Sequence, residues 1–192
     1  ANQSKIKSIT ITIDNTSYFY ASVLITDELI FAEINDRMFS FDLGLKEFLI
    51  GKKARFITDD IGYIVICDDY NVLEEENNLL SEHYEHIENP HFLKEEDDKI
   101  KHHQRLLSRK VYGSNRYEKQ RQTLAKAMRK PANRRKDFQH KKSTEIVSEN
   151  QVISLENLNV VGMSANHNLA KSIQDAAWGQ FTKMIEYKSL KY

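Results

Sequence analysis

Two carboxylates, Asp42 and Glu156, follow short apolar segments at the points where these segments end. Asp42 comes after residues 37–41 (RMFSF) and Glu156 after residues 152–155 (VISL). Short apolar runs rich in β-branched and aromatic side chains are typical of strands. A carboxylate at the end of a buried strand can meet acids from neighbouring strands and bind a hard cation, because Mg²⁺ prefers oxygen ligands. The pair indicates a candidate metal site, although strand-end acids also form turns.

Other side chains compete for this chemistry. Asp68-Asp69 end the apolar segment 63–67 and form a rival acid pair. His83 and His86 are three residues apart and could share a helix face, where imidazoles can bind a metal. Further histidines follow at His91, His102 and His103. Solvated histidines beside acids explain the same pattern, so both interpretations stay open.

Composition excludes several classes of protein. The 192 residues are 40% hydrophobic and 29% charged, enough for a core, and no apolar run approaches the length of a spanning helix. The first residues show no signal-peptide pattern, and the start at Ala1 rather than Met is typical of a processed or shortened chain. Cys67, expected as a buried thiol, is the only cysteine. We therefore expect no disulfide, no cysteine-based zinc site and an intracellular location.

Strands are expected in the first third of the chain. Residues 5–13 and 18–25 alternate apolar and polar side chains around a polar turn, which predicts a β-hairpin. A two-stranded hairpin is not stable alone, so it must pack on something or extend a larger sheet. After the strand at 37–41, further short strands are expected at 47–50, 55–58 and 63–67, in an antiparallel meander that follows Asp42.

Helices are expected in the rest of the chain. Residues 72–87 are acidic and helix-permissive, and 92–142 are helical in composition apart from breaks at 113–115 and Pro131. This predicts two or three long basic helices, the later ones continuing to about residue 149. After the strand at 152–155, one final helix is expected, with Trp178 in the core.

The net charge of zero hides a strong asymmetry. Residues 59–98 hold fourteen acids and one base, whereas 99–142 hold sixteen bases and two acids. Such an excess of positive charge on helices predicts a polyanionic partner, with the phosphates of nucleic acid as the expected contacts. The candidate phosphate-binding residues are Lys101, Arg105, Arg109, Lys110, Arg116, Arg121, Arg129, Arg134, Arg135 and Lys136.

Several motifs, taken in order along the chain, together resemble one family. The chain is similar to the RuvC-like core of the TnpB/OrfB proteins, which are transposon-encoded and akin to type V CRISPR effector nucleases. Residues 5–25 (KIKSITITIDNTSYFYASVLI) also resemble the last strands of that family's wedge domain. The segments that carry the resemblance are DLGLK (42–46), ENP-FLK (88–94), QRLLSRKVYGSNRYEKQRQTLAK (104–126), RRKDFQHKKST (134–144), VISLENLNVVGM (152–163) and LAKSIQDAAWGQF (169–181).

This resemblance implies an α/β fold: an RNase H-like (RuvC-like) mixed sheet with a long basic helical insertion and an N-terminal β-hairpin. In such a fold the first and fourth strands lie side by side. The implied organisation is a wedge-like remnant at 1–35 and a core at 36–192, with basic helices at 92–149. An acidic insertion at 51–86 departs from the family. It is either a solvated segment or a nucleic-acid mimic that docks on the basic helices.

The implied function is RNA-guided, Mg²⁺- or Mn²⁺-dependent DNA cleavage by a two-metal mechanism. Asp42 would bridge both ions and Glu156 would hold one of them. Asp175, in the final helix, matches an acid of the family's DA-WG motif and would either support the site or lie on the helix surface. The implied partners are guide RNA and target DNA, with no membrane, in the cytoplasm at the nucleoid.

Departures from the family leave the enzymatic activity open. The family's third catalytic Asp would lie beyond Tyr192, its zinc ribbon is absent, and so is much of its N-terminal region. One alternative is a catalytically deficient relative that keeps nucleic-acid binding. A weaker alternative is a fragment with a structural or protein-binding role. We expect the 192-residue chain to bind RNA or DNA and to cleave little by itself.

Overall fold

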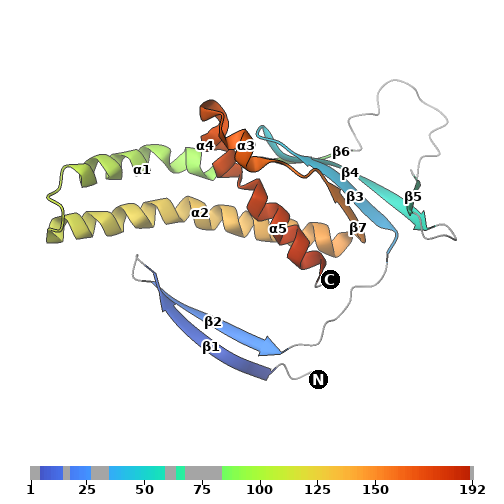
Figure 1. Cartoon of the computed structure of the whole chain (residues 1–192), viewed down its shortest axis with the longest axis horizontal. Helices are drawn as coiled ribbons and strands as arrows, with labels where there is room; N and C mark the ends of the chain where they lie inside the picture. Colours follow the sequence, from blue (N-terminus) through green and yellow to red (C-terminus); the bar gives the residue numbers. More distant parts are fainter. Residues whose placement is uncertain (1–4, 15–17, 27–34, 59–63, 68–83, 191–192) are drawn as a thin grey trace. The chain divides into compact units, whose positions relative to one another are not determined.

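The computed structural model describes residues 5–14, 18–26, 35–58, 64–67 and 84–190, which form a mixed α/β arrangement (Figure 1). The chain divides into two compact units, residues 1–30 with 92–136 and residues 31–91 with 137–192, and the division falls within one long helix. The predicted boundary at residue 35 stays a prediction. In the described part of the chain, no helix is long and apolar enough to cross a membrane.

The first unit contains the predicted β-hairpin. Strands β1 (Lys5–Ile13) and β2 (Phe19–Thr26) pair antiparallel, as the alternation of their side chains predicts. Asp14 closes the turn, since its backbone N–H donates to the carbonyl of Tyr18 (3.0 Å) and its carboxylate accepts from the Tyr18 N–H (3.1 Å). All residues of both strands are exposed.

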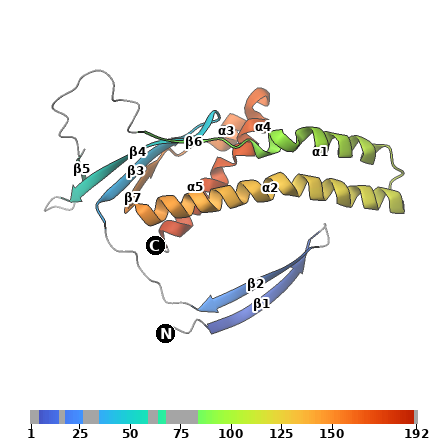
Figure 2. The same cartoon turned by 180° about the vertical axis from the view of Figure 1, so that it is seen from behind.

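A helical hairpin completes this unit. Helices α1 (Phe92–Ser108) and α2 (Asn115–Glu149) run antiparallel (Figure 2), as shown by the ion pairs Lys130–Glu96 (2.6 Å) and Arg134–Glu95 (2.6 Å). The predicted break near residue 113 is confirmed, but the break predicted at Pro131 is wrong. A proline inside a helix removes one backbone hydrogen bond and costs about 3 kcal/mol. Complete burial of Pro131 offsets this cost, and α2 continues through it.

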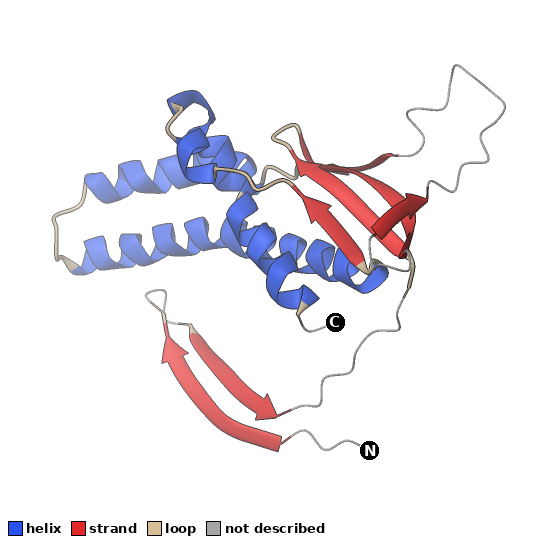
Figure 3. Cartoon of the chain, turned by 45° about the vertical axis from the view of Figure 1, so that its right-hand side comes forward, coloured by secondary structure: helices blue, strands red, loops and turns tan. Residues whose placement is uncertain are grey.

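The second unit is built on a five-stranded mixed sheet (Figure 3). Its order is β5 (Ile64–Cys67), β4 (Glu47–Thr58), β3 (Arg37–Leu43), β7 (Val152–Leu155), and β6 (Tyr84–Glu88) pairs with β4 next to β5. Strands β3, β4 and β5 form the predicted antiparallel meander. The parallel pairing of β3 with β7 joins segments that lie more than a hundred residues apart in the sequence.

Two predictions about this sheet are wrong. Residues 47–50 and 55–58 belong to one continuous strand, because the pairing with β3 extends from Leu49 to Arg55 without interruption. Residues 84–88 form strand β6, not the end of an acidic helix. Side chains of this strand alternate, with Ile87 buried and its neighbours His86 and Glu88 exposed, which is the period of a strand. Residues 72–83 lie outside the described part of the chain.

Helices cover one face of the sheet. Phe39, Phe41 and Leu43 alternate along β3 and are buried on this face. The ring of Phe48 meets Phe138 of α2 (5.2 Å between centroids) and Phe181 of α5 (5.0 Å), both edge-on. Such pairs of aromatic rings add about 0.5–1.5 kcal/mol to the free energy gained by burial.

The last part of the chain forms two helices, α4 (His167–Ala176) and α5 (Trp178–Ser189), and not the single helix predicted. Ala177 separates them with a left-handed backbone (φ 51°). Gln139 of α2, fully buried, donates to the carbonyl oxygens of Ala176 (2.9 Å) and Ala177 (3.2 Å) and so fixes this break. Trp178 is buried in the core, as predicted.

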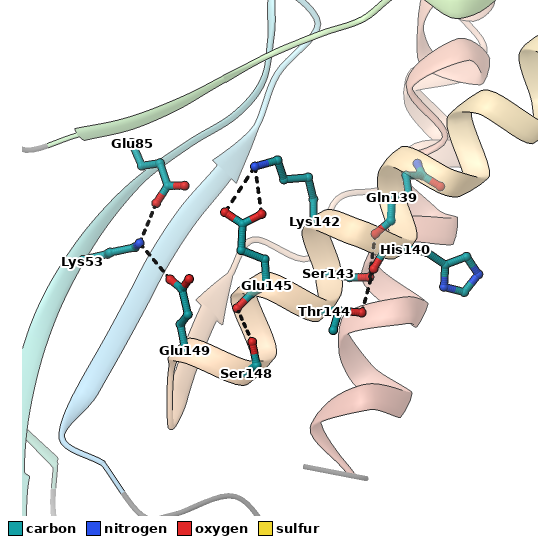
Figure 4. A network of polar contacts seen from close by, with 10 residues as sticks. All are labelled: Lys53, Glu85, Gln139, His140, Lys142, Ser143, Thr144, Glu145, Ser148 and Glu149. Carbon is teal, nitrogen blue, oxygen red and sulfur yellow. Dashed lines mark hydrogen bonds and ion pairs between the residues drawn. The ribbon is translucent and has the colours of Figure 1, made fainter.

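A polar network fixes the point where α2 leads into β7 (Figure 4). Lys53 of β4 makes ion pairs with Glu85 of β6 (3.1 Å) and with Glu149 at the end of α2 (3.2 Å). Two residues later, the Gln151 N–H donates to the carbonyl of Arg37 (2.9 Å), at the start of the β3–β7 pairing. The backbone bond begins the register in which β7 lies beside β3, and the ion pairs lie next to this point.

Candidate functional site

Asp42 and Glu156 each follow the last residue pair recorded between two adjacent parallel strands. The register of the β3–β7 pair runs from Met38↔Val152 to Phe41↔Leu155. Continued by one residue, this register would bring Asp42 next to Glu156. Neighbouring strands lie about 4.8 Å apart, a spacing at which two carboxylates can approach one ligand.

Both carboxylates lie on the face of the sheet away from the aromatic core. Asp42 is exposed between the buried residues Phe41 and Leu43, and Glu156 is exposed where β7 ends. The Leu43 N–H donates to Oδ1 of Asp42 (2.8 Å), which holds that carboxylate at the strand end. Oxygen donors at such a position fit a hard divalent cation such as Mg²⁺ or Mn²⁺.

A short connection leads from Glu156 to the helix α3 (Val160–Ser164). The Asn159 side chain accepts from the Gly162 N–H (2.9 Å) and caps this helix. A side chain on Gly162 would lie 2.8 Å from the Asn159 amide, so glycine is needed for this cap.

The competing side chains do not gather around another metal site in the described part of the chain, where no group of three or more His, Cys, Asp or Glu residues could hold an ion. Asp68-Asp69 and His83 lie outside the described residues. His86 contacts the Glu47 carboxylate through Nδ1, and the His103 ring lies 3.3 Å from Gln120. Asp175 is buried near the end of α4, so the predicted alternative of an exposed helix surface is wrong.

Beside Asp42, outward-facing side chains of the described strands form two rows across the sheet, and most of them are polar. The pairings Asp42↔Ile50 and Ile50↔His86 place His86 two strands away from Asp42 in the same row. The row behind it consists of Ser154, Ser40, Lys52 and Tyr84. Sequence reasoning missed these neighbours because it treated residues 84–88 as helix. The alternating pattern YEHIE was the available signal.

The predicted phosphate contacts on α1 and α2 fall into two groups. Some pair with acids of their own unit: Lys101 with Asp97 (2.8 Å), Arg121 with Glu118 (2.7 Å), Arg129 with Asp14 (2.8 Å) and Arg134 with Glu95 (2.6 Å). Arg105 donates to the Lys101 carbonyl (3.3 Å), and Arg135 is partly buried. Within the described residues, Arg109, Lys110, Arg116 and Lys136 are exposed and make no ion pair. These four offer the most accessible positive charge among the predicted contacts.

Comparisons with known proteins find similar sequences. Residues 74–167 match the family model OrfB_IS605, described as "Probable transposase". A protein of Streptomyces pristinaespiralis named "Putative RNA-guided DNA endonuclease" is 39% identical over 108 residues, which cover 56% of this chain and 27% of that protein.

A second relative, from Escherichia coli (strain K12), is named "Putative RNA-guided DNA endonuclease InsQ" and is 32% identical over 102 residues. That match covers 45% of this chain and 25% of the relative. The chain thus matches about a quarter of the length of each relative. Together the family model and both relatives support an assignment to the TnpB (OrfB) family.

Proposed function

We propose that this chain is the central part of an RNA-guided, divalent-metal-dependent DNA endonuclease. The observation that supports the proposal is the parallel pairing of β3 with β7, whose register, continued by one residue, would bring Asp42 next to Glu156. Each carboxylate comes from a separate motif of the family, DLGLK and VISLENLNVVGM. Their meeting at one sheet edge supports a shared role.

An RNase H-like (RuvC-like) core is part of the proposal. The sheet order β4–β3–β7, with β3 and β7 parallel and β4 antiparallel to β3, supports it, because the first and fourth strands of such a core are expected to lie side by side. The third strand is supplied by β5 and β6, which follow each other along the outer edge of β4. Helices that cover the aromatic face leave the acid-bearing face open for a polymeric substrate.

Asp42 and Glu156 would hold Mg²⁺ or Mn²⁺. A divalent ion bound there would activate water and stabilise the leaving oxygen of a phosphodiester. On the protein side, the hydrogen bond from the Leu43 N–H keeps the Asp42 carboxylate directed along the strand end. The outward-facing side chains of Ser40, Lys52 and His86 would line the path of the scissile strand and contact its phosphates.

The helical hairpin α1–α2 would bind guide RNA and target DNA through phosphates, while base pairing reads the sequence. The exposed cations Arg109, Lys110, Arg116 and Lys136 support this role, because they have no ion pair to lose within the described residues. Exposed ion pairs such as Lys101–Asp97 contribute little to stability and can be exchanged for a phosphate contact.

A second candidate function is nucleic-acid binding without cleavage. It is favoured by the donor set at the strand ends, because the described residues bring two carboxylates together and add no third His, Cys, Asp or Glu. A site with an incomplete ligand set loses most of its rate. The two functions differ in one measurable property, the metal-dependent cleavage of bound DNA.

The test measures binding and cleavage with the 192-residue chain. Labelled single-stranded RNA, single-stranded DNA and supercoiled plasmid are incubated with Mg²⁺ or Mn²⁺. We expect binding of all three and slow nicking that disappears in Asp42→Asn and Glu156→Gln. The control variant Glu186→Gln removes an exposed acid of α5 and should leave both properties unchanged. Binding with no nicking above the Asp42→Asn level would favour the second function, and no binding at all would overturn both.

A further inference from the structure

The loop that joins α1 to α2 is a defined structure at the tip of the helical hairpin. The Lys110 N–H donates to the Leu107 carbonyl (3.0 Å), which closes the end of α1. Ser114 caps the start of α2, since its Oγ accepts from the Tyr117 N–H (3.1 Å). Between them Gly113 adopts a left-handed backbone (φ 76°), with open space where a side chain would be. The turn therefore needs glycine for its backbone conformation and not for lack of room.

An aromatic ring projects from this tip. Tyr112 is 85% exposed, the preceding Val111 is 78% exposed, and both are among the most exposed large apolar side chains in the described part of the chain. The Tyr117 ring meets the Tyr112 ring at 5.1 Å and 60°. This edge contact restrains the Tyr112 ring and leaves most of its surface open. Aromatic side chains usually bury most of their large apolar area, so a restrained and open ring is costly without a ligand.

The charge around the ring is entirely positive. Residues 109–117 (RKVYGSNRY) contain Arg109, Lys110 and Arg116 and no acid. These three cations are exposed and have no ion pair within the described residues. The next acid, Glu118, is already bound to Arg121 (2.7 Å). A polyanion can therefore approach the tip without displacing a carboxylate.

We propose that this tip is a stacking site for an unpaired base of single-stranded nucleic acid. A base lies on the Tyr112 ring, while Arg109, Lys110 and Arg116 contact the flanking phosphates. Stacking on an aromatic side chain requires an open base face, which a continuous duplex does not offer. The ligand is thus single-stranded RNA or DNA, which offers an open base face together with phosphates.

This inference rests on the proposed nucleic-acid function and adds to it a specific subsite. The helical hairpin as a whole supplies positive charge that duplex and single strand share. Among the described residues of α1, α2 and the loop between them, only the tip combines charge with an exposed tyrosine ring. Contacts of the helical hairpin as a whole should therefore depend on phosphates, whereas the contact at the tip should depend on unpaired bases.

The experiment measures dissociation constants by fluorescence anisotropy for single-stranded RNA, single-stranded DNA and duplex DNA of equal length. Tyr112→Ala should weaken single-strand binding about 5- to 150-fold, the equivalent of ~1–3 kcal/mol for one stacked base. Duplex binding should change less than about twofold. Tyr112→Phe keeps the ring and should bind like the wild type. The Tyr187→Ala control removes an exposed tyrosine of α5 and should change neither affinity.

The two single-stranded arms identify the natural ligand. If RNA binds more tightly than DNA and this binding depends on Tyr112, the natural ligand is the guide RNA. If single-stranded DNA binds more tightly, the ligand is the displaced or target DNA strand. Because Tyr112 is exposed, its variants should fold, which circular dichroism and the fluorescence of the buried Trp178 can check.

Each unfavourable outcome has a separate meaning. If Tyr112→Ala binds single strands like the wild type while Arg109→Ala/Lys110→Ala binds more weakly, the stacking site is wrong and the nucleic-acid function stands. Equal losses on single strand and duplex would also overturn the stacking site. If the wild type binds none of the three ligands, the proposed function itself fails.

Discussion

Gly51 of β4 lies directly against the ring of Phe39 on the neighbouring strand, with no room for a side chain between them. A Cβ atom on Gly51 would come 2.5 Å from Cζ of Phe39 and 2.7 Å from Cβ of Phe41. Phe39 is fully buried and Phe41 nearly so, which means that neither ring can move into solvent. The absence of a side chain at Gly51 is what allows two phenylalanines to pack on the same face of β3.

Gly51→Ala should therefore destabilise the sheet that carries Asp42. Overpacking of a filled core typically costs about 1–3 kcal/mol, which lowers the Tm of a chain of this size by about 2–4 °C per kcal/mol. Thermal denaturation followed by circular dichroism measures the change. The matched control is Gly179→Ala in the first turn of α5, where a Cβ would meet nothing within 4 Å. It should leave the Tm unchanged or raise it, because alanine favours helix over glycine by up to about 1 kcal/mol. Equal losses in both variants would contradict this account of Gly51.

Lys188 of α5 gives a pH-dependent prediction. Its buried ammonium donates to the His140 carbonyl (2.7 Å), Ser143 Oγ (2.8 Å) and Thr144 Oγ1 (2.6 Å), and none of these is a carboxylate. Burial lowers the pKa of Lys188 below its ordinary value of 10.5. Between the lowered pKa and 10.5 the unfolded chain binds more protons than the folded chain, so the Lys188 contribution to stability rises with pH across this window.

Lys188→Met removes the titrating group but keeps most of the apolar contacts. The two hydroxyls keep their own hydrogen bonds, from Ser143 to the Gln139 carbonyl and from Thr144 to the His140 carbonyl. At pH 7 we expect the free energy of unfolding of the variant to equal that of the wild type or to exceed it by about 1–2 kcal/mol. This advantage should shrink toward pH 10.5 in urea denaturation at several pH values. A constant difference at all pH values would show that Lys188 does not titrate in this range.

Glu96 of α1 gives the opposite pH dependence. Its carboxylate is 7% exposed and bridges Lys130 of α2 (2.6 Å) and Lys99 (3.2 Å). Hydrogen bonds from Lys130 and Lys99 lower the pKa of Glu96 below 4.5. The stabilisation is thus complete above pH 4.5 and is lost as the pH falls through the folded-state pKa.

Glu96→Gln should lower the Tm at pH 7 and reduce the loss of stability below pH 4.5. The matched control, Asp137→Asn, removes an acid that pairs with Lys141 in solvent (2.7 Å) and should have little effect. Melting curves from pH 3 to 7 distinguish the two. The bridge would be unimportant for the helical hairpin if both variants melted alike.

The strands of the meander could be predicted from local pattern, whereas their long-range partners could not. Alternating side chains identified β1, β2 and β3 within two residues of their observed ends. The pairing of β3 with β7 spans more than a hundred residues, and no local pattern encodes it. It was expected only because the motifs around Asp42 and Glu156 resemble those of one family.

Two errors have a common physical origin. Alanine has no preference for a left-handed backbone, so nothing at Ala177 indicates that α4 ends there, and the buried side chain of Gln139 stabilises the break from another helix. Pro131 predicts a break that tertiary burial overrides. In both cases contacts between residues distant in sequence outweigh local backbone preference. The same holds for His86, because its position in line with Asp42 depends on the register of β6 with β4.

The exposed cations of α1 and α2 should dominate the salt dependence of nucleic-acid binding. Each phosphate contact contributes about 0.7 to the slope of log K against log salt for single strands. The double variant Arg116→Ala/Lys136→Ala should therefore have a slope that is less steep by about 1.4. Anisotropy titrations at several salt concentrations measure this slope. Lys101→Ala/Lys141→Ala removes two lysines that are paired with Asp97 and Asp137 and should lower it less. If both double variants made the slope less steep by the same amount, ion pairing within the chain would not decide which cations contact phosphates.

Removal of the acid pair should abolish stabilisation by Mn²⁺ without loss of the fold. A ligand that binds only the native state raises its stability by about 2.7 kcal/mol at a hundredfold excess over Kd. Wild-type chain should therefore melt several degrees higher with Mn²⁺ than after chelation. Asp42→Asn/Glu156→Gln should melt at one temperature under both conditions, because both side chains are exposed and amides bind the cation poorly. Glu186→Gln should respond to Mn²⁺ like the wild type. A metal-dependent shift that survives in the double variant would place the cation elsewhere and would separate the strand-end acids from catalysis.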